Sequence, residues 1–294
     1  MMPNADDRNA RLLRKRHRRA RYFSALCVVV TWTSVALLGV LLCEVCLRGF
    51  AWLDWQFLDS FPSRFPERAG IKSAVVGSLW LILLVAFIAI PVGVSTALCL
   101  EEFARKGRLL KIIDLNIANL AGVPSIVYGI LGLAIFVRFF ALGRSLLAAA
   151  LTMSLLILPL IIIASREAIA AVPRGIREAA LSLGATRWQT TWHHVLPAAL
   201  PGISTGIILA LSCAIGETAP LVMIGALTFV AFLPAGPMDG FTVLPIQIYN
   251  WASRPQPAFH ELAAAAIIVL LALLLLLNAA AIWLRYRSER REQE

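Results

Sequence analysis

Residues 146–164 read LLAAALTMSLLILPLIIIA, an apolar run without a charged side chain. A helix rises about 1.5 Å per residue, so about 20 residues cross the roughly 30 Å hydrocarbon core of a bilayer, and this run has the length of a membrane span. The 294-residue chain as a whole has the same character, since 60% of its residues are hydrophobic and only 15% are charged. Soluble domains contain roughly 45–50% apolar residues. This composition excludes a soluble globular protein.

Six apolar runs have the length of a span. They are Tyr22–Leu47, Ala74–Leu100, Ile117–Leu142, Leu146–Ala164, Leu196–Gly225 and Glu261–Leu284. The segments between them are too short to bury a core of their own. We therefore predict an all-α polytopic membrane protein with six transmembrane helices, whose function lies in or between the helices.

The distribution of basic residues predicts the orientation in the membrane. An even number of spans places residues 1–21, 101–116, 165–195 and 285–294 on the same side, and these segments hold twenty of the 27 Lys and Arg residues. Because Lys and Arg accumulate in cytoplasmic loops, both termini are predicted to be cytoplasmic. The net charge of +10 is then a signal of topology and of an anionic lipid surface, and it does not require nucleic-acid binding.

One of the basic segments contains the most informative motif. PRGIREAALSLGATRW begins at Pro173, which suits the first turn of a helix, and Glu178 follows early in that helix, where the dipole favours a carboxylate. Ala179 and Ala180 offer a small apolar surface, and Gly184 permits a turn or a close approach to another protein. Such a helix either rests on lipid headgroups or inserts into a socket of another protein.

The spacing of this motif favours the socket. Glu178-Ala179-Ala180, Gly184 and the later Leu196-Pro197 together resemble the EAA loop of ABC-importer permeases, although His194 stands where that family commonly has an aliphatic residue. The resemblance implies a cytoplasmic coupling helix that docks in a cleft of an ATP-binding subunit. Glu178, Ala179, Ala180 and Gly184 would then be the ATPase-coupling residues.

Three further strings are similar to the PstA family, the permease subunits of phosphate importers. They are NLAGVPSIVYGILGL from Asn119, GETAPL from Gly216 and FTVLPIQIYNWASRP from Phe241. The resemblance implies a bacterial plasma-membrane (inner-membrane) subunit for ATP-driven import of inorganic phosphate. Its implied partners are a second permease subunit, an ABC ATPase dimer and an extracytoplasmic phosphate-binding protein.

The resemblance extends over about Ala74–Leu284 and divides the chain into parts. These are a basic tail (1–21), a first transmembrane helix (22–47), a permease domain (74–284) that includes the coupling loop (165–195), and a second tail (285–294).

The chain lacks sequence signatures of catalysis. It contains no G-x-x-x-x-G-K-[ST] phosphate loop, so ATP and Mg are expected at the partner ATPase, with no cofactor bound by this chain. Cys43 and Cys46 form a C-x-x-C pair without a matching second pair, so no metal site is expected. An intramembrane enzyme remains the alternative, and it predicts turnover by the isolated chain.

The predicted translocation pathway centres on Glu217. This carboxylate lies in the fifth apolar run, where central placement costs roughly 2.5–3.5 kcal/mol, so it needs a partner or a wet cavity. A carboxylate repels phosphate, but it can accept a hydrogen bond from a protonated phosphate oxygen or orient an Arg. A purely structural carboxylate paired with an Arg is the alternative.

A departure from the family pattern bears on the substrate. Relatives usually carry Arg four residues before this Glu, where this chain has Cys213. The cation would then come from Arg138, Arg166 or the partner permease. Cys213 either faces a compensating partner cation or marks a preference for another anion in a related importer. We predict Glu217, Thr218, Cys213 and Arg166 as pathway residues, with Arg166 and its neighbour Glu167 forming either a gate pair or an ordinary interfacial ion pair.

Other residues predict helix packing. Gly202 and Gly206 form a G-x-x-x-G that permits close helix approach, and Asn278 is expected to form an interhelical hydrogen bond. The proline-containing loop 226–260 is expected to be irregular. Its apolar middle, Phe241–Trp251, is expected to anchor at the membrane boundary or to dock a partner.

Overall fold

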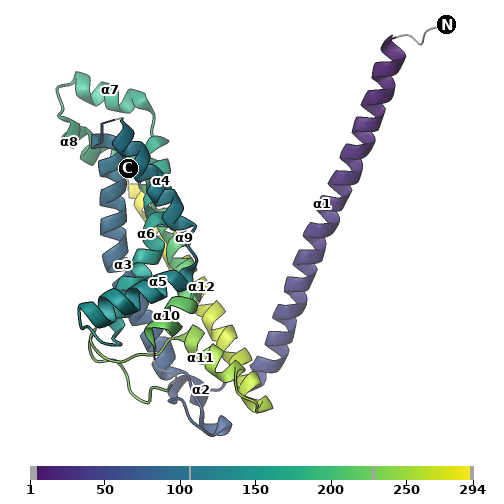
Figure 1. The fold of residues 1–294 in the computed structure, drawn as a ribbon, viewed down its shortest axis with the longest axis vertical. Coiled ribbons are helices and arrows are strands. Elements are labelled where there is room, and N and C mark those ends of the chain that lie inside the picture. The colour runs from purple at the N-terminus through teal and green to yellow at the C-terminus, as the bar shows by residue number, and fades with distance from the viewer. Residues whose placement is uncertain (1–4, 106, 227–228, 292–294) are drawn as a thin grey trace.

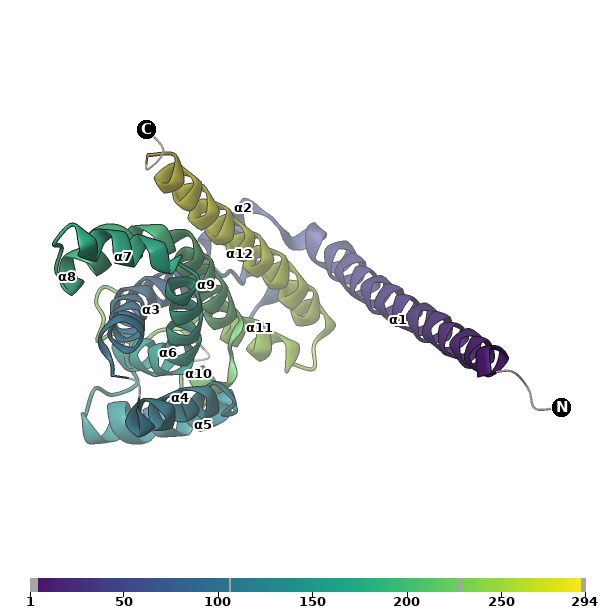
Figure 2. The same ribbon diagram turned by 90° about the horizontal axis from the view of Figure 1, so that it is seen from above.

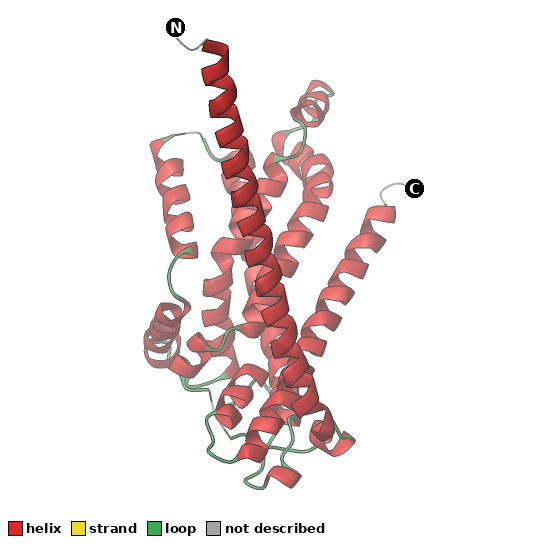
Figure 3. Ribbon diagram, turned by 90° about the vertical axis from the view of Figure 1, so that its right-hand side faces the viewer, coloured by secondary structure: helices red, strands yellow, loops and turns green. Residues whose placement is uncertain are grey.

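The computed structural model describes residues 5–105, 107–226 and 229–291, and every regular element in these ranges is helical (Figure 3). Five helical segments are long and apolar enough to cross a membrane, and a bent pair makes a sixth span if it is counted as one. The long helices are α1 (Ala5–Gly49), α3 (Lys72–Leu98), α6 (Leu146–Ala170), α9 (Leu196–Gly216) and α12 (Pro257–Arg291). The predicted all-α polytopic class is confirmed.

The third predicted span, Ile117–Leu142, is not a straight helix. It begins earlier, as α4 (Arg108–Ala121), and continues after a break as α5 (Ser125–Gly132) and the π-helical turn η4 (Leu133–Phe139), at 99° to α4. Pro124 lies in the break. A proline lacks the N–H that helix continuation needs and disfavours helical geometry in the residue before it, so the chain turns here.

The fifth predicted span is also shorter than expected. α9 ends at Gly216, and the chain begins a new helix, α10 (Ala219–Ile224), with Pro220 in its first turn. Glu217 therefore caps the end of α9 with extended backbone angles, φ −75° and ψ 125°, and does not lie inside a continuous helix.

Helix α6 is the centre of the bundle. It packs along α3 on one side and along α9 on the other, and Met153, Ile157 and Ile161 are buried between them. A Cβ added at Gly202 would lie 2.7 Å from the Ala168 Cβ. One added at Gly206 would collide with Ala164. The G-x-x-x-G prediction is confirmed, and the close approach that it permits lies within this subunit.

Short helices cover the two ends of the bundle (Figure 1). One end carries α7 (Arg174–Ser182), α8 (Arg187–Thr190) and the π-helical turns η3 (Cys99–Phe103) and η5 (Thr191–Val195). The other end carries η1 (Phe50–Trp52), α2 (Trp55–Asp59), η2 (Pro66–Arg68) and α11 (Leu244–Ala252). The first turn of α1 and the last turn of α12 lie toward the α7 end, as an even number of spans requires (Figures 1 and 3).

The apolar segment Phe241–Trp251 has a different role from the two expected. α11 packs on α12 and α3, and Phe241, Leu244 and Trp251 are fully buried within this chain. The segment therefore fills the core at that end, and most of its side chains are inaccessible to lipid or to a partner. Composition did not reveal this because core and interfacial segments are both apolar and aromatic.

Helix α1 stands apart from the bundle over most of its length (Figures 1 and 2). It runs unbroken across the predicted boundary between the basic tail and the first span. It approaches α12 at its last turn, where Gly49 lies against the backbone of Ala264 and Ala265.

Candidate functional site

Helix α7 is a short helix that projects from one end of the bundle (Figure 1). Pro173 is its N-cap residue, and Gly184, with φ +86°, ends it in the left-handed conformation that glycine adopts without steric cost. A Thr186–Gln189 capping box then starts α8. The predicted coupling segment is thus two short helices joined by a tight turn.

The four predicted coupling residues divide between the surface and the interior. Glu178, Ala179 and Gly184 are exposed, and nothing lies within 4 Å of a Cβ added at Gly184. Ala180 is buried on the inner face of α7. Leu183, beside the turn, is 90% exposed and adds an apolar side chain to the outer surface. The outer face of α7 is therefore small, largely smooth and open to another protein.

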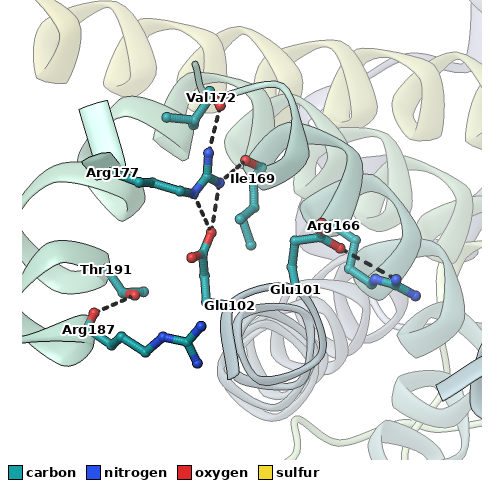
Figure 4. A network of polar contacts seen from close by, with 8 residues as sticks. All are labelled: Glu101, Glu102, Arg166, Ile169, Val172, Arg177, Arg187 and Thr191. Atoms are coloured by element: carbon teal, nitrogen blue, oxygen red, sulfur yellow. Dashed lines mark hydrogen bonds and ion pairs between the residues drawn. The ribbon is translucent and has the colours of Figure 1, made fainter. Parts of the chain in front are cut away.

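The inner face of α7 carries a charged side chain, Arg177 (Figure 4). Its Nε and one terminal nitrogen donate to Glu102 Oε1 of η3, at 3.0 and 2.7 Å. The two terminal nitrogens also donate to the carbonyl oxygens of Val172 and Ile169, at 2.7 and 2.9 Å. Arg177 therefore joins α7 to the end of α6 and to the end of α3.

A second arginine, Arg166 of α6, holds two carboxylates on other elements. It donates to Asp114 of α4 and, at 3.4 Å, to Glu101 of η3. Glu167, the expected gate partner, is exposed and is not the residue that pairs with Arg166. Adjacent glutamates of η3, Glu101 and Glu102, thus contact arginines on two different helices (Figure 4).

Sequence reasoning missed this network. Arg177 was visible only as a cation that indicates topology, and Arg166 was predicted as a pathway residue paired with Glu167. Glu102 is 75 residues from Arg177 in the chain. The available signal was a pair of adjacent acidic residues at the end of an apolar run, which needs cations nearby when partly buried.

The predicted pathway residues lie at the far end of α9 from α7. Glu217 and Thr218 are half-buried at the break between α9 and α10, and Cys213 is exposed one turn before it. Leu209, Cys213 and Gly216 form an exposed stripe on α9, next to its buried residues Ala210 and Ala214.

Arg166 does not lie beside these residues. α9 runs antiparallel to α6 with Gly202 on Ala168 and Gly206 on Ala164, so Arg166 is level with residue 204 of α9. That position is about 13 Å from Cys213 along the helix axis at 1.5 Å per residue. The structure thus separates a charged cluster near α7 from the Glu217 region.

The expected hydrogen bond of Asn278 is present. Ser212 Oγ of α9 donates to Asn278 Oδ1 of α12 at 2.7 Å and contacts the Ile208 carbonyl oxygen at the same distance. This bond lies next to Cys213 in sequence and fixes α12 against α9.

Comparisons with known proteins agree with this architecture. Residues 89–293 match the family described as "Binding-protein-dependent transport system inner membrane component". The phosphate transport system permease protein PstA of Mycobacterium leprae is 34% identical over 223 residues, which cover 74% of this chain and 72% of the relative. The probable ABC transporter permease protein YqgH of Bacillus subtilis is 37% identical over 194 residues, 64% of this chain.

Two further findings concern the extent of these similarities. The matched segment spans 66% and 60% of the lengths of two Bacillus subtilis relatives, YqgI and YqgH. A crystal structure of a bacterial alginate ABC transporter, in complex with an alginate-bound periplasmic protein, superposes with a TM-score of 0.64 at 16% identity, covering 92% of this chain and 96% of that one. That likeness concerns the fold. The chain is a multi-pass inner-membrane protein that belongs to the binding-protein-dependent family of ABC-importer permeases.

Proposed function

We propose that this chain is a transmembrane permease subunit of an ATP-driven importer of inorganic phosphate. The observation that carries the proposal is α7, a short helix at the end of the bundle with a small, open outer face of Glu178, Ala179 and the Gly184 turn. Phosphate as cargo is supported by the 34% identity to a PstA permease over 74% of the chain.

In this proposal α7 seats in a separate ATPase dimer, and the α7 end is cytoplasmic with both termini. ATP and Mg are bound by that dimer, and this chain binds no cofactor. Closure of the ATPase dimer pushes α7 and switches the permeases between outward and inward access by rigid-body rocking.

The pathway would lie between this chain and a second permease, expected to be a different chain. Support comes from α9, whose exposed stripe includes Cys213 in the last turn of an apolar helix. Three cavities stand out in the described ranges, and none of them is lined by Cys213, Glu217 or Thr218. A second permease facing α9 would enclose these residues, and an external phosphate-binding protein would deliver the anion.

Glu217 would distinguish protonated phosphate from a fully ionised oxyanion. Its carboxylate can accept a hydrogen bond from a P–OH group, which a fully ionised oxyanion does not offer. A cation is still needed for net attraction. Arg138 is exposed, whereas Arg166 is already held between Asp114 and Glu101, so Arg166 would belong to an inner gate.

The test is reconstitution of the chain with its partner permease, ATPase and binding protein in proteoliposomes. We expect uptake of radiolabelled phosphate that requires internal ATP and is competed by excess phosphate and not by sulfate or methionine. Uptake without ATP, or turnover of a substrate by the isolated chain, would contradict the proposal.

A related importer of another anion is the second candidate, and Cys213 is the observation that favours it. Restoring the basic residue, Cys213→Arg, distinguishes the two. Increased phosphate uptake would indicate that Cys213 marks a changed anion preference. Unchanged or reduced uptake would favour a compensating cation on the partner permease.

A further inference from the structure

Among the described residues, one ion pair joins α7 to the end of α3, beside a ring contact between Trp188 of α8 and Phe103 of η3. α7 is joined covalently to α6 by the short segment 171–173, but α3 is distant in sequence. The ion pair is Arg177–Glu102. Most other side chains of α7 point outward, and Ala180 is the buried one.

The Arg177–Glu102 pair is largely shielded from water, and all three guanidinium nitrogens of Arg177 donate hydrogen bonds. The Arg177 side chain is 20% exposed and that of Glu102 is 13% exposed, so water and salt screen their attraction less than at a surface pair. Arg177 also donates to two carbonyl oxygens just at and beyond the end of α6. A planar guanidinium that bonds three groups on two elements fixes their relative positions more firmly than a single contact does.

Glu102, the residue that Arg177 contacts at the end of α3, lies next to a second ion pair. η3 is a π-helical turn, a distortion that often marks functional sites in helices. Its Glu102 binds Arg177 of α7, and its Glu101 binds Arg166 of α6 (Figure 4). Arg166 in turn binds Asp114 of α4. A displacement that reaches Glu102 is therefore passed through Glu101 and Arg166 to α4.

We propose that the Arg177–Glu102 pair is the link that transmits movement of α7 to α3, and through Glu101 and Arg166 to α4. Arg177 and Glu102 are positioning residues in this scheme and touch neither the cargo nor ATP. The inference rests on the proposed function, because it requires that an ATPase moves α7. The outer face of α7 receives the ATPase, while the inner face determines whether that movement reaches the bundle.

The experiment uses the complete transporter in proteoliposomes and measures phosphate moved per ATP hydrolysed. We compare Arg177→Gln, Glu102→Gln, the double variant and Arg177→Lys, each normalised to the amount of ATPase that copurifies. We expect each Gln variant to lower this ratio by about tenfold and the double variant to lower it no further, because residues acting as one unit are not additive. Arg177→Lys keeps the charge and is expected to recover most of the ratio.

A matched control lies at the opposite end of α3. Lys72 and Asp59 form an ion pair of the same length, 2.7 Å, between α3 and α2. Lys72→Gln and Asp59→Asn are expected to leave the ratio within about twofold of the wild type, because this pair is more exposed and lies away from α7.

Three results would overturn the inference. The first is an unchanged ratio in both single Gln variants. The second is a fall of about a hundredfold in the double variant, as independent effects would require. The third is a lower yield of assembled transporter with a normal ratio. The last result would assign a purely structural role to the pair. Failure of the wild-type transporter to couple phosphate uptake to ATP would instead contradict the proposed function.

Discussion

The most apolar 18-residue stretches of helices α1 and α6 have nearly the same apolar character and opposite degrees of burial. Their mean hydropathies are 2.4 and 2.7, yet none of the α1 stretch is buried in this chain, against 61% of the α6 stretch. α1 meets α12 over its last turns, Glu44–Gly49, whereas α6 is enclosed by α3 and α9. Hydropathy therefore reports the solvent that a helix prefers, and close packing depends on where small residues allow backbones to approach.

The largest expected effect comes from adding the same side chain to a glycine in each region. Gly206→Ile places a branched side chain against Ala164 of α6, whereas nothing lies within 4 Å of a Cβ added at Gly39 of α1. We expect Gly206→Ile to lower the free energy of unfolding by about 3 kcal/mol through overpacking. Gly39→Ile should change it little. Reversible unfolding in mixed micelles measures both, and equal effects would contradict the contrast in packing.

The next effect concerns ion pairs on the two helices. Arg166 of α6 is 22% exposed and serves two carboxylates, whereas Arg48 of α1 is 59% exposed and pairs with Glu44 one turn away. Arg166→Gln leaves Asp114 and Glu101 partly buried without their shared cation, and we expect a loss of about 2 kcal/mol. Arg48→Gln should cost at most about 0.5 kcal/mol. The same unfolding measurement applies, and a larger effect at Arg48 would reverse our interpretation.

A smaller effect is expected where α12 meets α9. Asn278→Leu removes the hydrogen bond from Ser212, which keeps its contact with the Ile208 carbonyl oxygen. Interhelical hydrogen bonds in membranes contribute about 0.6 kcal/mol on average, so we expect a loss of that size. Ser212→Ala combined with Asn278→Leu should add little to either single change, because both remove the same bond. Independent effects would show that the bond is not formed.

Much of the architecture was predictable because the signals are local. The apolar runs indicate which segments are long and apolar enough to cross a membrane. The spacing of Glu178-Ala179-Ala180 and Gly184 predicted the helix α7 from the sequence alone. The breaks at Pro124 and Glu217 also had local signals, since proline interrupts a helix. Treating the third apolar run as one straight helix ignored the signal at Pro124.

The remaining features depend on contacts between distant residues. Arg177 and Glu102 are 75 residues apart, and no periodicity within either segment indicates that they meet. Trp251 is fully buried in a segment expected at the membrane boundary, because apolar composition does not distinguish a core from an interface. The inward position of Ala180 follows from how α7 sits on the bundle, which its own sequence does not specify.

The smallest effect is expected from removing the outer part of α1. Deleting residues 1–42 removes the part of α1 that stands apart from the bundle and keeps Glu44–Gly49 and η1, where Trp52 donates to Glu261. Because none of the most apolar 18-residue stretch of α1 is buried in this chain, the deletion should change the unfolding free energy of the bundle by less than about 0.5 kcal/mol. Unfolding of the shortened and the full-length protein in mixed micelles measures the difference. A large loss of stability would mean that α1 packs on α12 far beyond Gly49, and the contrast between the two helices would then reflect one arrangement of α1 and not an intrinsic property of the fold.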